Sequence, residues 1–418
     1  MTSDSPIHEG RKRPPGAAVV EPSPFTLTDL RGVRAAGVRA GIKASGNPDV
    51  ALLVTDGPVP CAGVFTQNLL AAAPIIVCRE HLQRSGGLLR ALVVNSGCAN
   101  ACTGERGLAD ARAMCQQVAA ALRCPEEQVL VCSTGVIGQR LPMDRVHSGI
   151  AAAMRALSTA PEAGRRFLQA IMTTDAFPKE AAGQLSLGSE TATIAGVCKG
   201  AGMIHPNMAT MLAFLGMDLA MDQAALQEAL PRIAARSFNA VHVDSHPSTN
   251  DTLLLFATGH SGRNPPAPST WIADVTRVAR RLSWLIARDG EGATKVTTIT
   301  IRGAQSDEAA RAVASHVALS ALVRTALFGN DPNWGRFVSQ VGNCAAVRSV
   351  AGLRCELQGI TVFADGEPTA FDRKAASQAM ATEDVQLTLI LTEGSGEAEL
   401  MTSDLGYRYV EVNAEYTT

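Results

Sequence analysis

A chain of 418 residues, 46% hydrophobic and 18% charged, exceeds the usual size of one hydrophobic core and has an ordinary globular composition. Its formal net charge of −2 and its aromatic content of 4% argue against a surface for nucleic acid or an anionic membrane. No apolar run approaches the roughly 18 residues of a membrane span, so we expect a cytoplasmic protein with no nucleic-acid and no membrane partner.

The first 24 residues are polar and Pro-rich, and we expect them to form a flexible tail. Short β-type runs then alternate with helical patterns, which predicts a mixed α/β chain whose helices cover packed sheets. The predicted strands are 51–55, 63–66, 74–78, 91–95, 129–133, 252–258, 295–302, 359–364, 386–392 and 407–412. The predicted helices are 105–123, 144–157, 161–172, 222–237, 269–288 and 307–326.

The common cofactor and metal motifs are missing from the sequence. Ten Cys are irregularly spaced without a CxxC pair, and the eight His are scattered, so we expect buried reduced thiols and no metal site. The GAG at 200–202 does not complete a dinucleotide-binding loop, because His205 stands at its third glycine position. The chain also lacks a P-loop, a zinc-protease motif and a hydrolase nucleophile elbow.

Seven polar clusters carry Ser, Thr or Asn, mostly beside Gly. They are NSGCANACTG (95–104), STGVIG (133–138), MTTDAFPK (172–179), STNDT (248–252), RDGEGATK (288–295), GNDPNWGR (329–336) and VNAEYTT (412–418). Each cluster alone is more often a helix cap or a turn. Together they could supply the hydroxyls, amides and backbone N–H groups that acyl transfer needs.

Thr210 stands between a breaker-rich loop and an apolar run, in KGAGMIHPNMATMLAF (199–214). It either begins a strand or supplies a reactive oxygen. This segment, together with STGVIG, TTDAFPK, DGEGATK, GNDPNWGR and VNAEYTT, resembles the ArgJ family, the ornithine/glutamate N-acetyltransferases of arginine biosynthesis. The resemblance runs from about residue 25 to the last residue, with the motifs in the order of the family.

The resemblance implies a layered αββα sandwich of the ArgJ/DmpA type with N-terminal-nucleophile chemistry, plus a smaller C-terminal lobe. It also implies self-cleavage between Ala209 and Thr210. The products would be an α chain and a β chain. The α chain comprises the N-terminal tail and residues 25–209, and the β chain comprises residues 210–418. Two chains of each kind would form a heterotetramer.

By the same resemblance, Thr210 becomes the N-terminal nucleophile of an acetyltransferase. Its α-amine, with an ordinary pKa of roughly 7.7–8.0, can accept the proton of its own hydroxyl. The acetyl group would move from N²-acetyl-L-ornithine to L-glutamate by a ping-pong mechanism through acetyl-Thr210. Thr134 and Gly135 would stabilise the oxyanion, through the Thr hydroxyl and a Gly backbone N–H.

The family positions that hold the substrate correspond to Thr173, Lys199, Thr210, Glu291, Asn413 and Thr418. Thr174 stands beside Thr173 and could be the contact instead. No cofactor is required, and acetyl-CoA is a possible second acetyl donor that the sequence does not decide.

One region departs from the expected family pattern. The chain reads VDSHPSTNDT (243–252) where we expect VDGDTSTNDT, so that Ser245, His246 and Pro247 stand in an altered loop. The change could alter loop geometry or substrate preference.

Two rival functions remain open at this point. A self-processed aminopeptidase or amidase of similar fold would use water in place of glutamate as the acceptor. An uncleaved, non-catalytic binding protein would keep Thr210 only as a strand residue.

Overall fold

The computed structural model describes residues 25–187, 190–204, 211–244 and 246–415. Its helices are α1 (Ala73–Arg84), α2 (Gly104–Leu122), α3 (Met143–Ala156), α4 (Pro161–Ile171), α5 (Gln223–Ala235), α6 (Pro268–Arg288), α7 (Asp307–Leu319), α8 (Ala321–Phe328), α9 (Trp334–Gly342), α10 (Arg373–Ala379) and α11 (Tyr407–Glu415). Its strands are β1 (Val33–Val38), β2 (Val50–Phe65), β3 (Leu88–Cys98), β4 (Val129–Val136), β5 (Lys179–Leu187), β6 (Glu190–Lys199), β7 (Leu212–Met217), β8 (Val241–His242), β9 (Thr252–Ala257), β10 (Val296–Ala304), β11 (Arg354–Leu357), β12 (Ile360–Ala364), β13 (Glu367–Pro368), β14 (Asp384–Ile390) and β15 (Gly396–Ser403).

Strand β2 links two β layers. Its first half pairs with β1 and β3, and its second half pairs with β9, which gives the order β4-β3-β2-β9-β7-β6-β5 with β1 also on β2. We call β1–β4 the first layer and β5, β6, β7 and β9 the second layer. Apolar residues of both layers share one core, in which Phe167 of α4 meets Phe214 of β7 edge-on at 5.9 Å. The two layers are therefore packed against one another.

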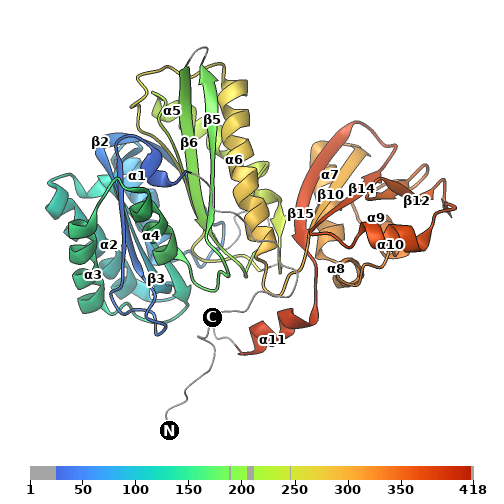
Figure 1. The fold of residues 1–418 in the computed structure, drawn as a ribbon, viewed down its shortest axis with the longest axis horizontal. Coiled ribbons are helices and arrows are strands. Elements are labelled where there is room, and N and C mark those ends of the chain that lie inside the picture. Colours follow the sequence, from blue (N-terminus) through green and yellow to red (C-terminus); the bar gives the residue numbers. More distant parts are fainter. Residues whose placement is uncertain (1–24, 188–189, 205–210, 245, 416–418) are drawn as a thin grey trace, which may run out of the picture.

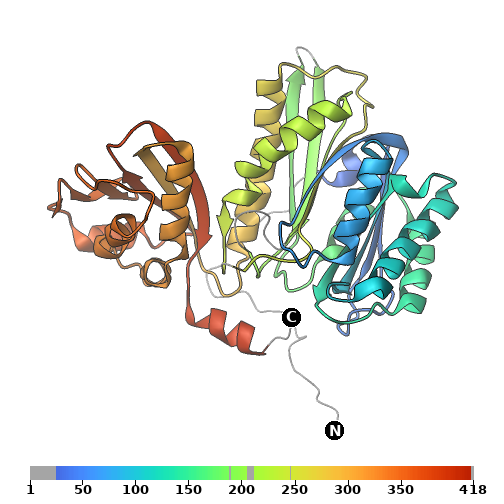
Figure 2. The same ribbon diagram turned by 180° about the vertical axis from the view of Figure 1, so that it is seen from behind.

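Helices cover the outer faces of these layers (Figure 1). Helices α1 and α2 pack on β4, α5 packs on β2 and β9, and α6 packs on β5 and β6, where the apolar residues of α5 and α6 form a second core with the strands. Figure 2 shows α5 lying across the strands beside α6. Helix α6 begins with Pro268 in its first turn and buries Val275, Leu282 and Ile286 along one face. The predicted αββα layering is confirmed.

The two central strands of the second layer bring distant segments together. Strands β7 and β9 run parallel, with Leu212 opposite Thr252, and all their residues are buried. Continuous apolar runs such as LAFLGM and TLLLFA are typical of strands covered on both faces. Consequently the residues just before each strand, at 211 and 251, lie side by side inside the molecule.

The C-terminal lobe has its own sheet, in the order β13-β12-β11-β14-β10-β15-β8, and its own core. Strand β10 pairs with β14 in parallel and with β15 antiparallel, and α7 covers both β10 and β15. After β15 the chain leaves this lobe, and α11 extends along the lower side of the molecule in Figure 1. The predicted smaller C-terminal lobe is confirmed.

Three predicted elements are wrong. Residues 74–78 are not a strand but part of α1, in which Pro74 occupies the first turn. The run of β-branched residues after Pro74 is typical of a strand and led to the wrong prediction. Residues 407–412 alternate like a strand but form α11, since they pair with neither sheet. The single helix predicted at 307–326 is divided at Ser320, which ends α7 and caps α8 by accepting a hydrogen bond from the Val323 N–H.

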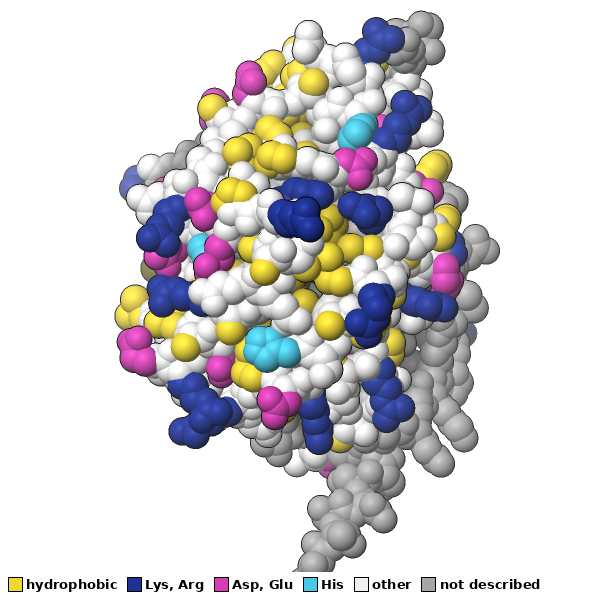
Figure 3. Space-filling view, turned by 90° about the vertical axis from the view of Figure 1, so that its left-hand side faces the viewer, with side chains coloured by type: hydrophobic (Ala, Val, Ile, Leu, Met, Phe, Trp, Pro, Cys, Tyr) yellow, Lys and Arg dark blue, Asp and Glu magenta, His cyan; other side chains and the backbone are white. Residues whose placement is uncertain are grey.

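The surface agrees with the small net charge. On the face shown in Figure 3, Lys and Arg side chains are interspersed with Asp and Glu around a stretch of hydrophobic side chains. Within the described ranges, no helix combines the length and apolar character required to cross a membrane. All ten cysteines are free thiols, and eight of them are buried.

Candidate active site

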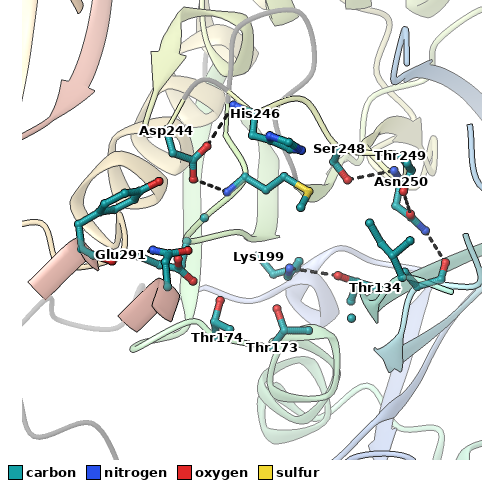
Figure 4. Close-up of a pocket in the computed structure, with 18 residues that line it drawn as sticks. Thr134, Thr173, Thr174, Lys199, Asp244, His246, Ser248, Thr249, Asn250 and Glu291 are labelled. Atoms are coloured by element: carbon teal, nitrogen blue, oxygen red, sulfur yellow. Dashed lines mark hydrogen bonds between the residues drawn. The ribbon is translucent and has the colours of Figure 1, made fainter. Parts of the chain in front are cut away.

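One pocket of about 300 Å³ collects residues from both β layers and from α11 (Figure 4). Its lining consists of Ala99, Thr134, Gly135, Ile137, Thr173, Thr174, Lys199, Ala201, Gly202, Met203, Asp244, His246, Ser248, Thr249, Asn250, Glu291, Tyr409 and Asn413. This volume is at the lower end of the range for small-molecule sites, which suits a ligand of amino-acid size.

Six of the predicted site residues line this pocket, namely Thr134, Gly135, Thr173, Lys199, Glu291 and Asn413. Thr174 lines it as well, so the choice between the two threonines stays open. The predicted cleavage residues Ala209 and Thr210, and the C-terminal Thr418, lie outside the described residues. The structure describes Ile204 and Met211, the residues on either side of the segment 205–210 that contains Thr210.

Thr134 and Gly135 are positioned by the end of β4. The Gly135 backbone has φ = 131°, and a Cβ atom there would lie 2.3 Å from the Gly97 carbonyl carbon, so only glycine fits. Thr134 is buried, and its Oγ accepts a hydrogen bond of 3.1 Å from the Lys199 ammonium. Because an ammonium group can only donate, the Thr134 hydroxyl proton stays available for an acceptor in the pocket.

Lys199 is the buried cation of the pocket. Burial lowers its pKa, and the neighbouring Lys179 lowers it further, whereas the carboxylates of Asp175, Asp251 and Glu291 raise it. The acidic groups around Lys199 therefore favour its charged form against the cost of burial.

Behind the pocket lies a buried ion cluster of Lys179, Asp175 and Asp289. The Lys179 ammonium donates to both carboxylates at 2.6 Å, and all three side chains are almost completely buried. Burial raises the pKa of Asp289 to about 6. Burial also acts to raise the pKa of Asp175, but the ammonium groups of Lys179 and Lys199 outweigh it and hold that pKa below its ordinary value.

The same carboxylates hold the backbone of the pocket. Asp175 accepts hydrogen bonds from the N–H groups of Thr173 at 2.9 Å and Gly200 at 2.7 Å. Asp289 accepts one from Ala176 at 3.0 Å. The cluster therefore ties MTTDAFPK and RDGEG to the residue that follows Lys199.

The opposite side of the pocket is acidic. The Glu291 carboxylate packs closely on Gly202, where a Cβ atom would lie 2.6 Å from it, so a larger residue would displace the carboxylate. Asp244 accepts hydrogen bonds from the N–H groups of Met203 and Ile204, and burial raises its pKa. Lys199 and the two carboxylates thus offer both signs of charge to a ligand.

Several lining residues were not predicted as site residues. Asp244, Ser248, Thr249, Asn250 and Tyr409 also contribute to the pocket. Ser248, Thr249 and Asn250 belong to the polar cluster STNDT (248–252), so the sequence carried a signal for these three residues. His246, in the altered loop, also lines the pocket, whereas its neighbour Ser245 is outside the described residues.

Asp175 and Lys179 were missed for a different reason. Their spacing of four residues within MTTDAFPK was visible, but the partner of the pair, Asp289, is 110 residues further along the chain. The described part of the chain holds no group of His, Cys, Asp and Glu side chains able to bind a metal ion.

Comparison with known proteins identifies the family of the chain. The model of the ArgJ family matches residues 34–418. A Synechococcus protein named arginine biosynthesis bifunctional protein ArgJ is 44% identical over 407 residues, which cover 94% of this chain and 97% of the relative. A protein of the same name from Symbiobacterium thermophilum is 46% identical, with 94% and 98% covered.

Solved structures show the same similarity. The ornithine acetyltransferase of Mycobacterium tuberculosis, solved in complex with ornithine, is 42% identical over 45% of this chain and 96% of that chain, with a TM-score of 0.40. An ArgJ structure from Bacillus halodurans is 42% identical over 44% of this chain and 95% of that chain, with a TM-score of 0.42.

Proposed function

The chain belongs to the ArgJ family and is an acetyltransferase of arginine biosynthesis, and we propose that it moves the acetyl group of N²-acetyl-L-ornithine to L-glutamate. The observation that carries the proposal is the meeting of Thr134, Lys199 and Glu291, from three distant motifs, around one pocket of about 300 Å³. A pocket of that size with charges of both signs suits a zwitterionic amino acid.

The proposed nucleophile is Thr210, released by cleavage of the Ala209–Thr210 bond. Its hydroxyl attacks the Ala209 carbonyl carbon, the C–N bond breaks, and water hydrolyses the resulting ester. The new α-amine then serves as a base beside the hydroxyl, which explains why no His is required. The products would be an α chain ending at Ala209 and a β chain beginning at Thr210, assembled as two of each.

Acetyl transfer follows in two halves. The Thr210 oxygen attacks the acetyl carbon of acetylornithine while the α-amine takes its proton. The amide C–N bond breaks, and the leaving amine of ornithine receives that proton. The amine of glutamate then attacks the acetyl ester, the ester C–O bond breaks, and the Thr210 oxygen regains its proton.

Thr134 and Gly135 are the proposed oxyanion donors in both halves. The ammonium of Lys199 occupies an acceptor site on the Thr134 oxygen, which favours donation of the hydroxyl proton to the developing oxyanion. Lys199 can also attract the α-carboxylate of either substrate, while Glu291 can pair with the side-chain ammonium of ornithine. Thr173 or Thr174, Asn413 and Thr418 are the remaining proposed contacts.

Two assays test the proposal. Mass spectrometry of the purified protein is expected to give chains ending at Ala209 and beginning at Thr210, and Thr210→Ala is expected to leave one chain without transferase activity. A cleaved, active Thr210→Ala protein would exclude the assigned nucleophile. Thr210→Ser should retain some processing, because a hydroxyl persists.

The second assay separates transfer from hydrolysis. Acetylornithine is supplied with and without glutamate, and N-acetylglutamate is expected only with glutamate. Rapid release of acetate without glutamate would favour the self-processed amidase. Acetyl-CoA in place of acetylornithine tests the second acetyl donor.

A further inference from the structure

The acetyl-transfer mechanism assigns no role to the polar segment Ser248–Asp251. This segment leads into β9, and all four of its side chains are buried beside the pocket. Burying consecutive polar side chains is costly unless each one is hydrogen-bonded. Asn250 hydrogen-bonds to the segment that carries the oxyanion donors, and Asp251 hydrogen-bonds to Met211, the residue after the proposed nucleophile. These two parts of the site must meet during catalysis.

Asn250 holds the segment that carries the oxyanion donors. Its side-chain amide donates to the Ala99 carbonyl at 2.6 Å and to the Ser133 carbonyl at 2.9 Å. Ser133 directly precedes Thr134, and Ala99 in turn binds the Val136 carbonyl through its N–H at 3.0 Å. The hydroxyl of Thr249 donates to the Asn250 Oδ1 at 2.6 Å and so fixes the orientation of the amide.

Asp251 holds Met211, the residue that follows the proposed nucleophile. Its Oδ1 accepts a hydrogen bond of 3.1 Å from the Met211 N–H, and the next residue, Thr252, donates its N–H to the Met211 carbonyl at 3.1 Å. Met211 is therefore fixed at both ends of its backbone. Its nitrogen is bonded to the carbonyl carbon of Thr210, at the ordinary peptide distance of about 1.33 Å.

We propose that Asn250 and Asp251 are positioning residues that together set the distance between Thr210 and the oxyanion donors Thr134 and Gly135. Two adjacent residues are a short and stiff connection between Thr134, near the end of β4, and Met211, just before β7, which are 77 positions apart in the sequence (211 − 134 = 77). Attack on a carbonyl requires reacting atoms about 3–3.5 Å apart, and a displacement of 1 Å costs about a hundredfold in rate. The inference rests on Thr210 being the nucleophile.

The first test compares Asn250→Ala with the control Gln358→Ala. Gln358 lies in the C-terminal lobe, and its amide likewise donates to two backbone carbonyls, those of Ala379 and Asp384, so both variants lose matched contacts. Asn250→Ala is expected to lower kcat by about 10- to 100-fold with less than a threefold change in the KM for acetylornithine. Gln358→Ala should lower the melting temperature with kcat unchanged. Equal kcat values for the two variants would overturn the proposal.

A double variant tests whether Asn250 acts through the oxyanion donors. In the Thr134→Val background, adding Asn250→Ala is expected to lower kcat by less than about threefold further. A fully multiplicative loss would show that Asn250 acts elsewhere and would refute the assignment. If Asn250→Ala fails to fold, Thr249→Val removes only the hydroxyl that orients the amide. It should lower kcat by about three- to tenfold, and an unchanged kcat would count against the proposal.

Asp251 is tested by two variants. Asp251→Asn keeps an oxygen for the Met211 N–H and should retain cleavage and a kcat within about fivefold of the original protein. Asp251→Ala removes that acceptor and should slow cleavage and lower kcat at least tenfold. If Asn fails as completely as Ala, the charge matters rather than the anchor, and the proposal is wrong. An original protein that cannot use acetylornithine would instead refute the proposed function.

Discussion

Removing the cation of the buried cluster by Lys179→Met should destabilise the protein strongly. The methionine preserves most of the side-chain volume but leaves Asp175 and Asp289, each 2.6 Å from the ammonium and almost fully buried, without a counter-charge. Breaking a buried ion pair from one side costs about 3–5 kcal/mol. At about 2–4 °C per kcal/mol for domains of this size, the melting temperature should fall by about 6–20 °C.

The loss should also depend on pH. Without Lys179, burial raises the folded-state pKa of both carboxylates above their unfolded values. Such groups bind protons more readily in the folded state, so the variant loses stability as pH rises through those raised pKa values. The difference in melting temperature between variant and original protein should therefore be smaller at pH 5 than at pH 8.

Calorimetry or circular dichroism at the two pH values measures both effects. Arg166→Met serves as control, because Arg166 pairs with Glu162 at 3.5 Å on the exposed side of α4 and such pairs contribute about 0–1 kcal/mol. A fall of less than 2 °C for Lys179→Met, or a fall that is the same at both pH values, would refute this account of the cluster.

Three further predictions concern the pocket and strand β5. Glu291→Gln should raise the KM for acetylornithine by about 10- to 100-fold, since a hydrogen bond to a charged group contributes about 1.5–3 kcal/mol. Mass spectrometry should still show complete cleavage of this variant, and unchanged kinetics would remove Glu291 from the site. Thr134→Val should lower kcat by about 10²–10³-fold in the transfer assay, and a smaller loss would assign the oxyanion to other donors. Burial raises the pKa of Glu180 to about 7, so its ionisation costs stability as pH rises from about 4.5 through 7. Glu180→Gln should therefore raise the melting temperature at pH 8.5 but not at pH 5, and an equal effect at both pH values would contradict the assignment.

The sequence predicted the elements with strong periodicity. Helices α2, α3, α4, α5 and α6 begin and end within two residues of the predicted ranges. Strands β5 and β6 were missed, because KEAAGQLSL and ETATIAGVCK are rich in Ala, Gly and Thr and show little alternation. Their stability comes from pairing with one another and with β7, which is a tertiary property.

The candidate site residues were predicted from sequence motifs, whereas the residues that hold them in place could be found only from the fold. The resemblance of the motifs to the ArgJ family singled out Thr134, Lys199 and Glu291. They did not identify Asn250 or Asp251, whose partners are up to 151 residues away in the sequence. A side chain that serves only backbone groups leaves no pattern of spacing, and its role becomes visible only when strands are paired.

The position of the pocket follows from how the layers meet. Thr134 lies two residues before the end of β4, Lys199 ends β6, and Met211 directly precedes β7. Because β7 is antiparallel to β6 and parallel to β9, the end of β6 and the starts of β7 and β9 share one edge of the second layer. Asn250 joins that edge to the end of β4 in the first layer. The motifs that contain Thr134, Lys199 and Asn250 therefore converge because each one stands close to where a strand reaches this edge.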